Sequence, residues 1–283
     1  MEELRVLKKR REEQVLQPPN ASLTSPASGA LPPDVRRKIY LIGISGPSGV
    51  GKSTLKERLA DHFGFPVKYL QACSWCKPAR RVVRTQTKCC IGNDYFWHHP
   101  SCIVFDKHLQ IIQELEDHFS VATHCPQSWP LRMGDIINEK MKGEPLPFNR
   151  PIAILVDGAN MFTDVRVAES FDFLIYLQAG LPTVRHRRAI RNKVKAGQRE
   201  KFYARHIECD WQKMHEPFVK LETRNIEAVA GMEAPHCPKR EIRWMDGERN
   251  KDDLFAEASS EILSWFCELG YKADLWENAC LRP

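Results

Sequence analysis

The chain has 283 residues, of which 42% are hydrophobic and 28% are charged, and its formal net charge at pH 7 is +6. This composition is typical of a globular protein that can bury a full core. No apolar run approaches the roughly 20 residues needed to cross a bilayer, which argues against a membrane protein. The mild positive charge suits polyphosphate ligands and does not require nucleic acid, so we do not expect a nucleic-acid partner.

Cysteine usage and the N-terminal residues bear on the compartment. The ten cysteines are irregularly spaced, and Met1–Arg5 lack the apolar segment of a secretory signal. We therefore expect reduced thiols and a cytoplasmic location. The basic run Lys8–Arg11 could instead be a nuclear address, although a solvated helix face is the simpler interpretation.

Composition divides the chain into three parts. Residues 1–34 read as a short charged helix followed by a linker rich in Pro, Ser, Ala and Gly. We predict one large folded domain over residues 35–270 and a C-terminal tail over residues 271–283.

A phosphate-loop pattern, G-x-x-x-x-G-K-[ST], lies between a predicted buried strand, Ile39–Ile44, and a predicted helix, Lys52–His62. The glycines let backbone N–H groups converge on a polyphosphate, with the positive end of the helix behind them. We expect Lys52 to reach the β- and γ-phosphates and the Ser53 hydroxyl to bind Mg²⁺. The predicted ATP-binding residues are Gly46, Pro47, Ser48, Gly49, Val50, Gly51, Lys52, Ser53 and Thr54.

A second strand is predicted at Val67–Gln71, and a cysteine-containing segment follows it. Cys73-x-x-Cys76 has the spacing of zinc ligands, but the adjacent pair Cys89-Cys90 is a poor second half. We favour ordinary buried thiols, with zinc binding as the alternative.

The apolar run Ile152–Val156 ends in an acid, Asp157, which is the pattern of a buried parallel strand. A carboxylate at the end of such a strand faces the crevice in which α/β sheets bind ligands. We therefore predict that Asp157 holds Mg²⁺, directly or through water. Capping of the next turn is the alternative.

A third strand, Phe171–Leu177, leads into a basic helix, Val184–Lys193. A solvated basic face usually explains such a run. Because the chain already contains a phosphate loop, a lid over the transferred phosphoryl group is an equally good interpretation. Three arginines of this helix are candidate catalytic residues: Arg187, Arg188 and Arg191.

The remaining predicted elements complete an α/β chain. They are helices at Phe105–Phe119, Met133–Lys142, 203–222 (interrupted near Pro217) and Lys251–Phe266, and a strand at Glu241–Met245. We predict the three-layer P-loop NTPase fold, with a mostly parallel sheet, helices on both faces and a helical lid.

These features resemble the phosphoribulokinase/uridine kinase family of P-loop kinases, and within it the nicotinamide riboside kinases, over residues 38–268. The phosphate loop alone is shared with many NTPases, but the ordered set of motifs is more specific. The likeness rests on Ile42–Thr54, on His99-Pro100 followed by Phe105-Asp106, on Val156–Gly158, on Tyr176–Arg191, and on Trp244–Gly247 followed by Asp252–Phe255.

The resemblance implies a phosphotransferase that uses ATP and Mg²⁺ to phosphorylate a ribosyl hydroxyl of a small molecule. The family places an aspartate, the candidate base, after its second strand, but Gln71–Pro78 lacks it. Either residues 72–90 are an insertion and Asp94 is the displaced acid, or no base exists there and Asp157 or nothing replaces it. We favour Asp94 as the catalytic base.

Aromatic side chains after this acid could stack on a nucleoside base, although core packing competes as an explanation. The candidate substrate-binding residues are Tyr95, Phe96, Trp97 and His99. Two other functions are considered: a catalytically lapsed nucleotide-binding protein of the same fold, and another P-loop NTPase that contacts nucleic acid. The sequence predicts no oligomeric state.

Overall fold

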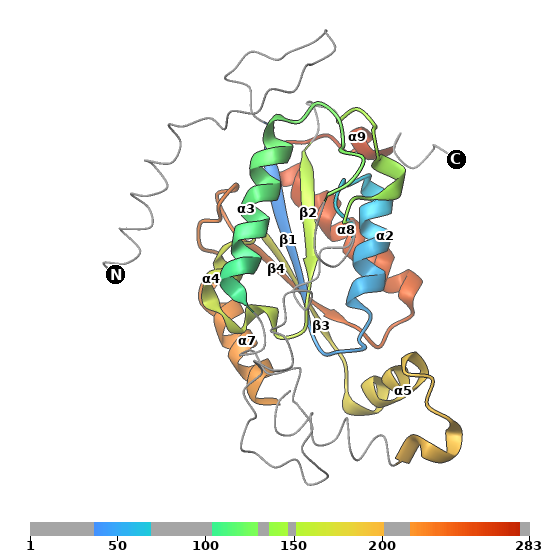
Figure 1. Ribbon diagram of the computed structural model, residues 1–283. Coiled ribbons are helices and arrows are strands. Elements are labelled where there is room, and N and C mark those ends of the chain that lie inside the picture. Colours follow the sequence, from blue (N-terminus) through green and yellow to red (C-terminus); the bar gives the residue numbers. More distant parts are fainter. Residues whose placement is uncertain (1–36, 69–103, 130–135, 147–150, 201–215, 278–283) are drawn as a thin grey trace. The chain divides into compact units, whose positions relative to one another are not determined.

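A four-stranded parallel sheet forms the centre of the structure, a computed structural model that describes residues 37–68, 104–129, 136–146, 151–200 and 216–277 (Figure 1). These residues belong to one unit, Arg36–Pro283. The strands lie in the order β2-β1-β3-β4, and every neighbouring pair is parallel. They are β1 (Ile39–Ser45), β2 (Ile152–Asp157), β3 (Phe173–Gln178) and β4 (Glu241–Asp246).

The sequences of the strands explain their central position. β1 and β2 are almost entirely apolar, and each of their residues is buried, as expected for parallel strands covered on both faces. The register pairs Ile44 with Asp157, and Gln178 with Asp246. The strands therefore end together, and the loops that follow them meet at one edge of the sheet, where α/β proteins bind ligands.

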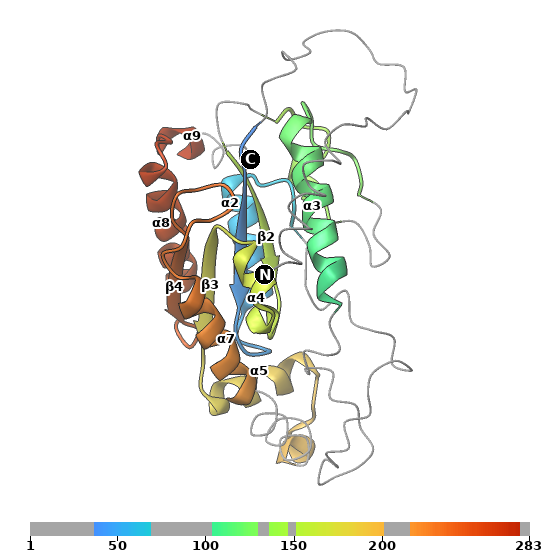
Figure 2. The same ribbon diagram turned by 90° about the vertical axis from the view of Figure 1, so that its left-hand side faces the viewer.

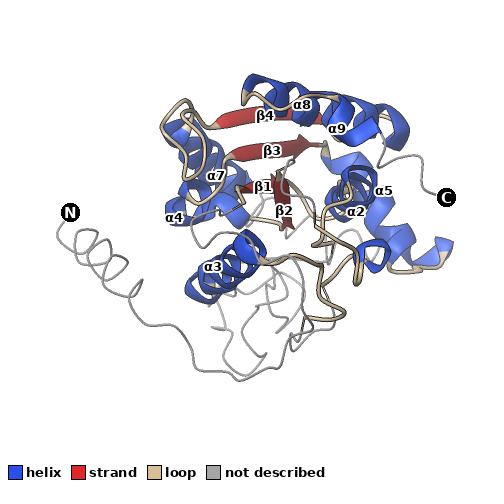
Figure 3. Ribbon diagram, turned by 90° about the horizontal axis from the view of Figure 1, so that it is seen from above, coloured by secondary structure: helices blue, strands red, loops and turns tan. Residues whose placement is uncertain are grey.

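Helices cover both faces of this sheet (Figure 3). One face carries α3 (Phe105–Val121), α4 (Val165–Glu169) and α7 (Glu216–Val229), whose buried residues share one hydrophobic cluster. The other carries α2 (Lys52–Phe63) and α8 (Lys251–Glu268), which share a second cluster. The predicted α/β fold with a parallel sheet between helical layers is confirmed.

Helix α5 (Leu181–Arg191) lies outside these layers, beyond the edge at which the strands end (Figures 1 and 2). This is where the predicted lid should be. Short helical segments complete the described residues: Glu139–Met141, Met161–Thr163, Ala196–Gln198 and α9 (Asp274–Glu277). Among the helices within these ranges, none combines the length and the apolar character that a membrane span needs.

Local signals account for several helix limits. Gly64 ends α2 in the left-handed conformation, with a φ of 63°, which glycine adopts without strain. The side chain of Asn250 accepts a hydrogen bond from the Asp252 amide (2.8 Å) and caps α8. Pro217 lies within α7, next to residues 201–215, which the structure does not describe, so the predicted interruption there stays a prediction.

Two predictions differ from the structure before β2. The helix predicted at Met133–Lys142 is wrong over its described part, since only Glu139–Met141 is helical. Ile137 instead forms an antiparallel bridge with Val67, which draws the chain into an extended conformation. Val67 itself makes isolated bridges only, and residues 69–71 of the predicted strand lie outside the described residues.

Candidate phosphate-binding site

The segment between β1 and α2 makes a tight turn that depends on glycine. Gly46, Gly49 and Gly51 have φ values of 136°, 91° and 114°, which side-chain-bearing residues rarely adopt. A Cβ atom on Gly46 would lie 2.3 Å from the carbonyl oxygen of Leu177, so the turn passes directly against the end of β3. A glycine turn before a helix N-terminus is the backbone arrangement that fits a polyphosphate.

The ammonium of Lys52 folds back over this turn. Its Nζ atom donates to the carbonyl oxygens of Gly46 (2.8 Å) and Pro47 (2.9 Å), and Lys52 is buried. The turn therefore carries a fixed positive charge close to the start of α2. Such a charge complements the β- and γ-phosphates of a nucleotide.

Asp157, at the end of β2, lies opposite the first turn of α2. The Ser53 hydroxyl donates to Oδ2 of Asp157 over 2.7 Å. The Nζ atom of Lys56, one turn further along α2, lies 2.5 Å from Oδ1. A hydroxyl and a carboxylate are the hard oxygen ligands that Mg²⁺ prefers, so Ser53 and Asp157 fit a magnesium site.

A buried carboxyl group, Glu222 of α7, supports the turn from the other side of the sheet. Its Oε1 atom lies 2.6 Å from the Ser45 hydroxyl, at the end of β1, and accepts from the Phe162 amide at 3.0 Å. The Tyr176 hydroxyl of β3 donates to Oε2 at 3.3 Å. Burial raises the pKa of Glu222 to about 7, against the lowering effect of its hydrogen bond with Ser45. One side chain thus links α7 to β1 and β3.

Arg187 of α5 connects the glycine turn to the loop after β4. Its Nη1 atom donates to the carbonyl oxygens of Val50 (2.9 Å) and Gly247 (2.6 Å). This double contact fixes the basic helix against the turn, because the planar guanidinium can reach two acceptors at once.

Two further arginines of α5 lie against the same turn. Nη2 of Arg191 donates to the Ser48 hydroxyl at 3.3 Å. A Cβ atom on Gly49 would lie 2.9 Å from Cγ of Arg188. The structure thus brings Arg187, Arg188 and Arg191 to the glycine turn, and their catalytic role stays a prediction.

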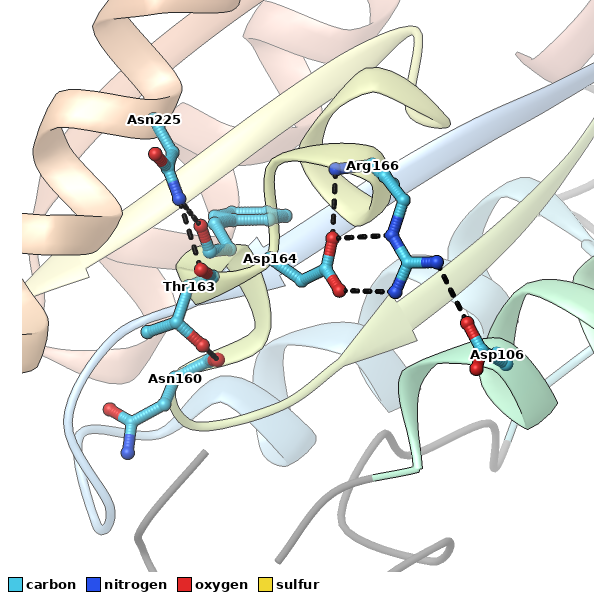
Figure 4. Close-up of polar contacts among 7 residues, drawn as sticks. Asp106, Asn160, Thr163, Asp164, Arg166 and Asn225 are labelled. Carbon is cyan, nitrogen blue, oxygen red and sulfur yellow. Dashed lines mark hydrogen bonds and ion pairs between the residues drawn. The ribbon is translucent and has the colours of Figure 1, made fainter. Parts of the chain in front are cut away.

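The segment after Asp157 is held by polar contacts from three helices (Figure 4). Asn225 of α7 donates to two carbonyl oxygens of the turn Met161–Thr163, at 2.8 and 3.1 Å. Arg166 of α4 pairs with Asp164 (2.6 Å) and with Asp106 of α3 (2.8 Å). These contacts restrict the backbone that follows the candidate metal carboxylate.

A cavity of about 470 Å³ opens beside the turn, between α7 and the ends of β3 and β4. Its lining combines apolar surface with three carboxylates and one lysine. The lining residues are Pro47, Tyr176, Gln178, Ala179, Gly180, Glu216, Val219, Lys220, Asp246 and Glu248. A concave site of this size that mixes apolar and polar groups is suited to a small organic ligand.

Several predicted site residues lie outside the described residues. They are Asp94, the candidate base, the substrate candidates Tyr95, Phe96, Trp97 and His99, and the cysteines Cys73, Cys76, Cys89 and Cys90. Their roles therefore stay predictions.

Sequence reasoning missed two charged residues that adjoin the site. Lys56 lies four residues after Lys52, one turn along the same helix, and this spacing could have suggested it. Glu222 carried no comparable signal, because its place depends on how α7 packs across β1 and β3.

Comparison with known proteins identifies a family. A model described as the phosphoribulokinase/uridine kinase family matches residues 41–213. A comparison with curated proteins found no match.

Proposed function

Since the chain belongs to the phosphoribulokinase/uridine kinase family, we propose that it is an ATP-dependent kinase that phosphorylates a hydroxyl group of a nucleoside-like ribosyl substrate. Nicotinamide riboside and uridine represent the substrate types that we expect. The family consists of P-loop kinases, which in general use ATP with Mg²⁺. The acceptor, the site residues and their roles are part of the proposal.

The observation that carries the proposal is the pairing of a glycine turn with a strand-end carboxylate. The buried Lys52 ammonium lies on the turn, and Ser53 contacts Asp157 across the crevice at 2.7 Å. In our proposal, the turn and Lys52 bind the nucleotide phosphates, and Ser53 and Asp157 hold Mg²⁺. The bound metal would neutralise charge that develops on the phosphoryl group.

Helix α5 supplies the cations that phosphoryl transfer requires. We assign Arg187 to holding the helix on the turn, because its guanidinium already bonds Val50 and Gly247. Arg188 and Arg191 are then placed to stabilise charge on the transferred group, since charge stabilisation is the main catalytic contribution in this chemistry.

The catalytic base is assigned to Asp94. Both oxygens of Asp157 already accept hydrogen bonds, from Ser53 and Lys56, so Asp157 is poorly placed to receive the proton of the acceptor hydroxyl. Asp94 belongs to the acid–aromatic segment that we identify with the displaced motif of the family.

The cavity beside Pro47 is proposed to take the acceptor. It adjoins the turn on the α7 side of the sheet, whereas Arg187 packs against the turn at Val50. Carboxylates in its lining can accept hydrogen bonds from sugar hydroxyls, and its apolar part can contact a ring. Tyr95, Phe96, Trp97 and His99 would complete the acceptor site.

A second candidate function follows from the missing acid at Gln71–Pro78. If Asp94 does not replace the acid, the chain would be a catalytically lapsed nucleotide-binding protein. Such a protein would bind ATP and release no ADP with any acceptor.

Coupled ADP release, measured across nucleosides, nicotinamide riboside, pantothenate and ribulose phosphate, tests the proposal. We expect ribosyl acceptors to stimulate ADP release, and Lys52→Ala to reduce the rate by about 100-fold or more. Asp94→Ala should also abolish turnover, whereas retained turnover in this variant would move the base elsewhere. Tight ATP binding, with no acceptor stimulating ADP release, would favour the second candidate function, a nucleotide-binding protein without kinase activity.

A further inference from the structure

Lys56 of α2 is a fully buried lysine that pairs with Asp157 at the end of β2. Its side chain has 0% exposure, and that of Asp157 has 5%. The Nζ atom lies 2.5 Å from Oδ1 of Asp157, while Oδ2 accepts from Ser53. The two oxygens of this carboxylate therefore face different partners, a fixed cation and a neutral hydroxyl.

Fastening α2 to β2 does not require this ion pair. Leu55 and Leu59 of α2 already pack in the same hydrophobic cluster as Ala153 and Leu155 of β2. A buried ion pair adds little stability over apolar groups of the same volume, because removing both charges from water is costly. Lys56 is therefore best explained by what its charge does to Asp157.

The charge of Lys56 acts against a divalent cation at this position. The positive charge of Lys56 balances the negative charge of Asp157. The buried ammonium of Lys52 adds a further positive charge on the nearby turn. A divalent cation that approached Ser53 and Asp157 alone would meet the ammonium groups of Lys56 and Lys52 together with a single carboxylate at the end of β2. The phosphates of a nucleotide on the turn would reverse that balance.

We propose that Lys56 is a positioning residue that balances the charge of Asp157 and holds its Oδ1 atom. As a result, a divalent cation binds at Ser53 and Asp157 only together with a nucleotide. This inference rests on the proposed function in treating Ser53 and Asp157 as the metal-facing pair. Lys56 holds Oδ1 of Asp157 and leaves Oδ2 on the side of Ser53. It also makes metal binding depend on the nucleotide.

Binding of Mn²⁺, followed by electron paramagnetic resonance without any turnover, tests this inference. The nucleotide-free wild-type chain should bind Mn²⁺ weakly, and ADP should strengthen the binding. Lys56→Met, which removes the charge and keeps most of the volume, should bind Mn²⁺ without nucleotide about tenfold more tightly or better. Lys56→Arg, which keeps the charge, should behave as the wild type.

The double variant Lys56→Met/Asp157→Asn should lose the added Mn²⁺ binding, which assigns it to this carboxylate. Equal Mn²⁺ affinities of the nucleotide-free wild type and Lys56→Met would overturn the inference. If Lys56→Met does not fold, Lys56→Gln takes its place in the comparison with the wild type. Tight Mn²⁺ binding by the nucleotide-free wild type would also overturn the inference. A failure of the wild type to bind ADP would instead contradict the proposed kinase function.

Discussion

The Ser45 hydroxyl lies 2.6 Å from Oε1 of Glu222 and 3.0 Å from the carbonyl oxygen of Gly158. A hydroxyl carries one proton, so it can donate to only one of these oxygens. A Ser45 hydroxyl that donates to Glu222 favours the ionised form of this carboxyl group. Burial has the larger, opposite effect and raises the pKa of Glu222 to about 7.

This pKa predicts how stability depends on pH. The folded chain keeps a proton on Glu222 up to about pH 7, whereas the unfolded chain releases it near 4.5. Because the native state binds more protons in this window, the free energy of unfolding should fall as pH rises from about 4.5 through 7. Glu222→Gln stays neutral and should lack this loss, which amounts to on the order of 3 kcal/mol.

Urea unfolding at pH 5 and pH 8 measures the effect as a difference between variant and wild type. Burial also raises the pKa of Asp172, to about 6, but both proteins share that contribution. Glu227→Gln, on the exposed face of the same helix, should keep the wild-type pH dependence. Parallel pH profiles of Glu222→Gln and the wild type would contradict the prediction.

The glycine turn between β1 and α2 was predicted from sequence because its signal is local. Glycine conformation, the lysine and the helix start all lie within Gly46–Ser53, and each residue acts through the backbone next to it. Asp157 was also predictable, since an acid that ends an apolar strand faces the ligand edge of a parallel sheet. The arginines of α5 were candidates because they lie on a basic helix in a chain that contains a phosphate loop.

Residues that act through long-range packing were beyond sequence reasoning. Glu222 contacts Ser45, from which it is separated by 177 positions in the sequence. No hydrophobic periodicity in the sequence predicts such a contact. A helix was predicted over Met133–Lys142, but the pairing of Ile137 with Val67 holds the chain there in an extended conformation. Tertiary contacts decide such segments, because intrinsic helix preferences amount to less than about 1 kcal/mol per residue.

Arg187→Ala should weaken catalysis by detaching α5 from the turn. The guanidinium bonds two carbonyl oxygens, of Val50 and Gly247, and without it Arg188 and Arg191 lose their fixed position. We expect kcat/KM to fall by on the order of 100-fold. Arg185→Ala is the matched control on the same helix, because Arg185 pairs at 3.7 Å with the exposed Glu200, and its kinetics should change little. Equal kinetics of the two variants would show that Arg187 does not hold the lid.

Val219→Trp tests which substrate occupies the cavity beside Pro47. Val219 is part of the cavity lining on α7, and an indole there would fill space proposed for the acceptor. The KM of the acceptor should rise by about tenfold or more while the KM of ATP stays close to the wild-type value. Leu221→Trp, at a half-exposed position of the same helix outside the cavity lining, should leave both constants unchanged. A rise in the KM of ATP alone would assign the cavity to the nucleotide.

Gly247→Ala should displace the glycine turn without removing any charged group. Gly247 is buried after β4, and a Cβ atom there would lie 2.2 Å from Cγ2 of Val50 and 2.9 Å from the carbonyl oxygen of Gln178. Neither approach is tolerable, so Val50 and the turn must move. Overpacking of this kind costs about 1–3 kcal/mol of stability.

Nucleotide affinity reports that movement directly. Binding of ADP, measured by calorimetry, should weaken by about tenfold or more in Gly247→Ala, because a shift near 1 Å misaligns the groups that bind phosphate. Gly197→Ala is the control: among the described residues, no atom lies within 4 Å of the position that its methyl group would take. Its stability should therefore change by less than about 0.5 kcal/mol, and its ADP affinity should be unaltered. If Gly247→Ala binds ADP as tightly as Gly197→Ala does, the contact between Val50 and Gly247 does not set the shape of the turn.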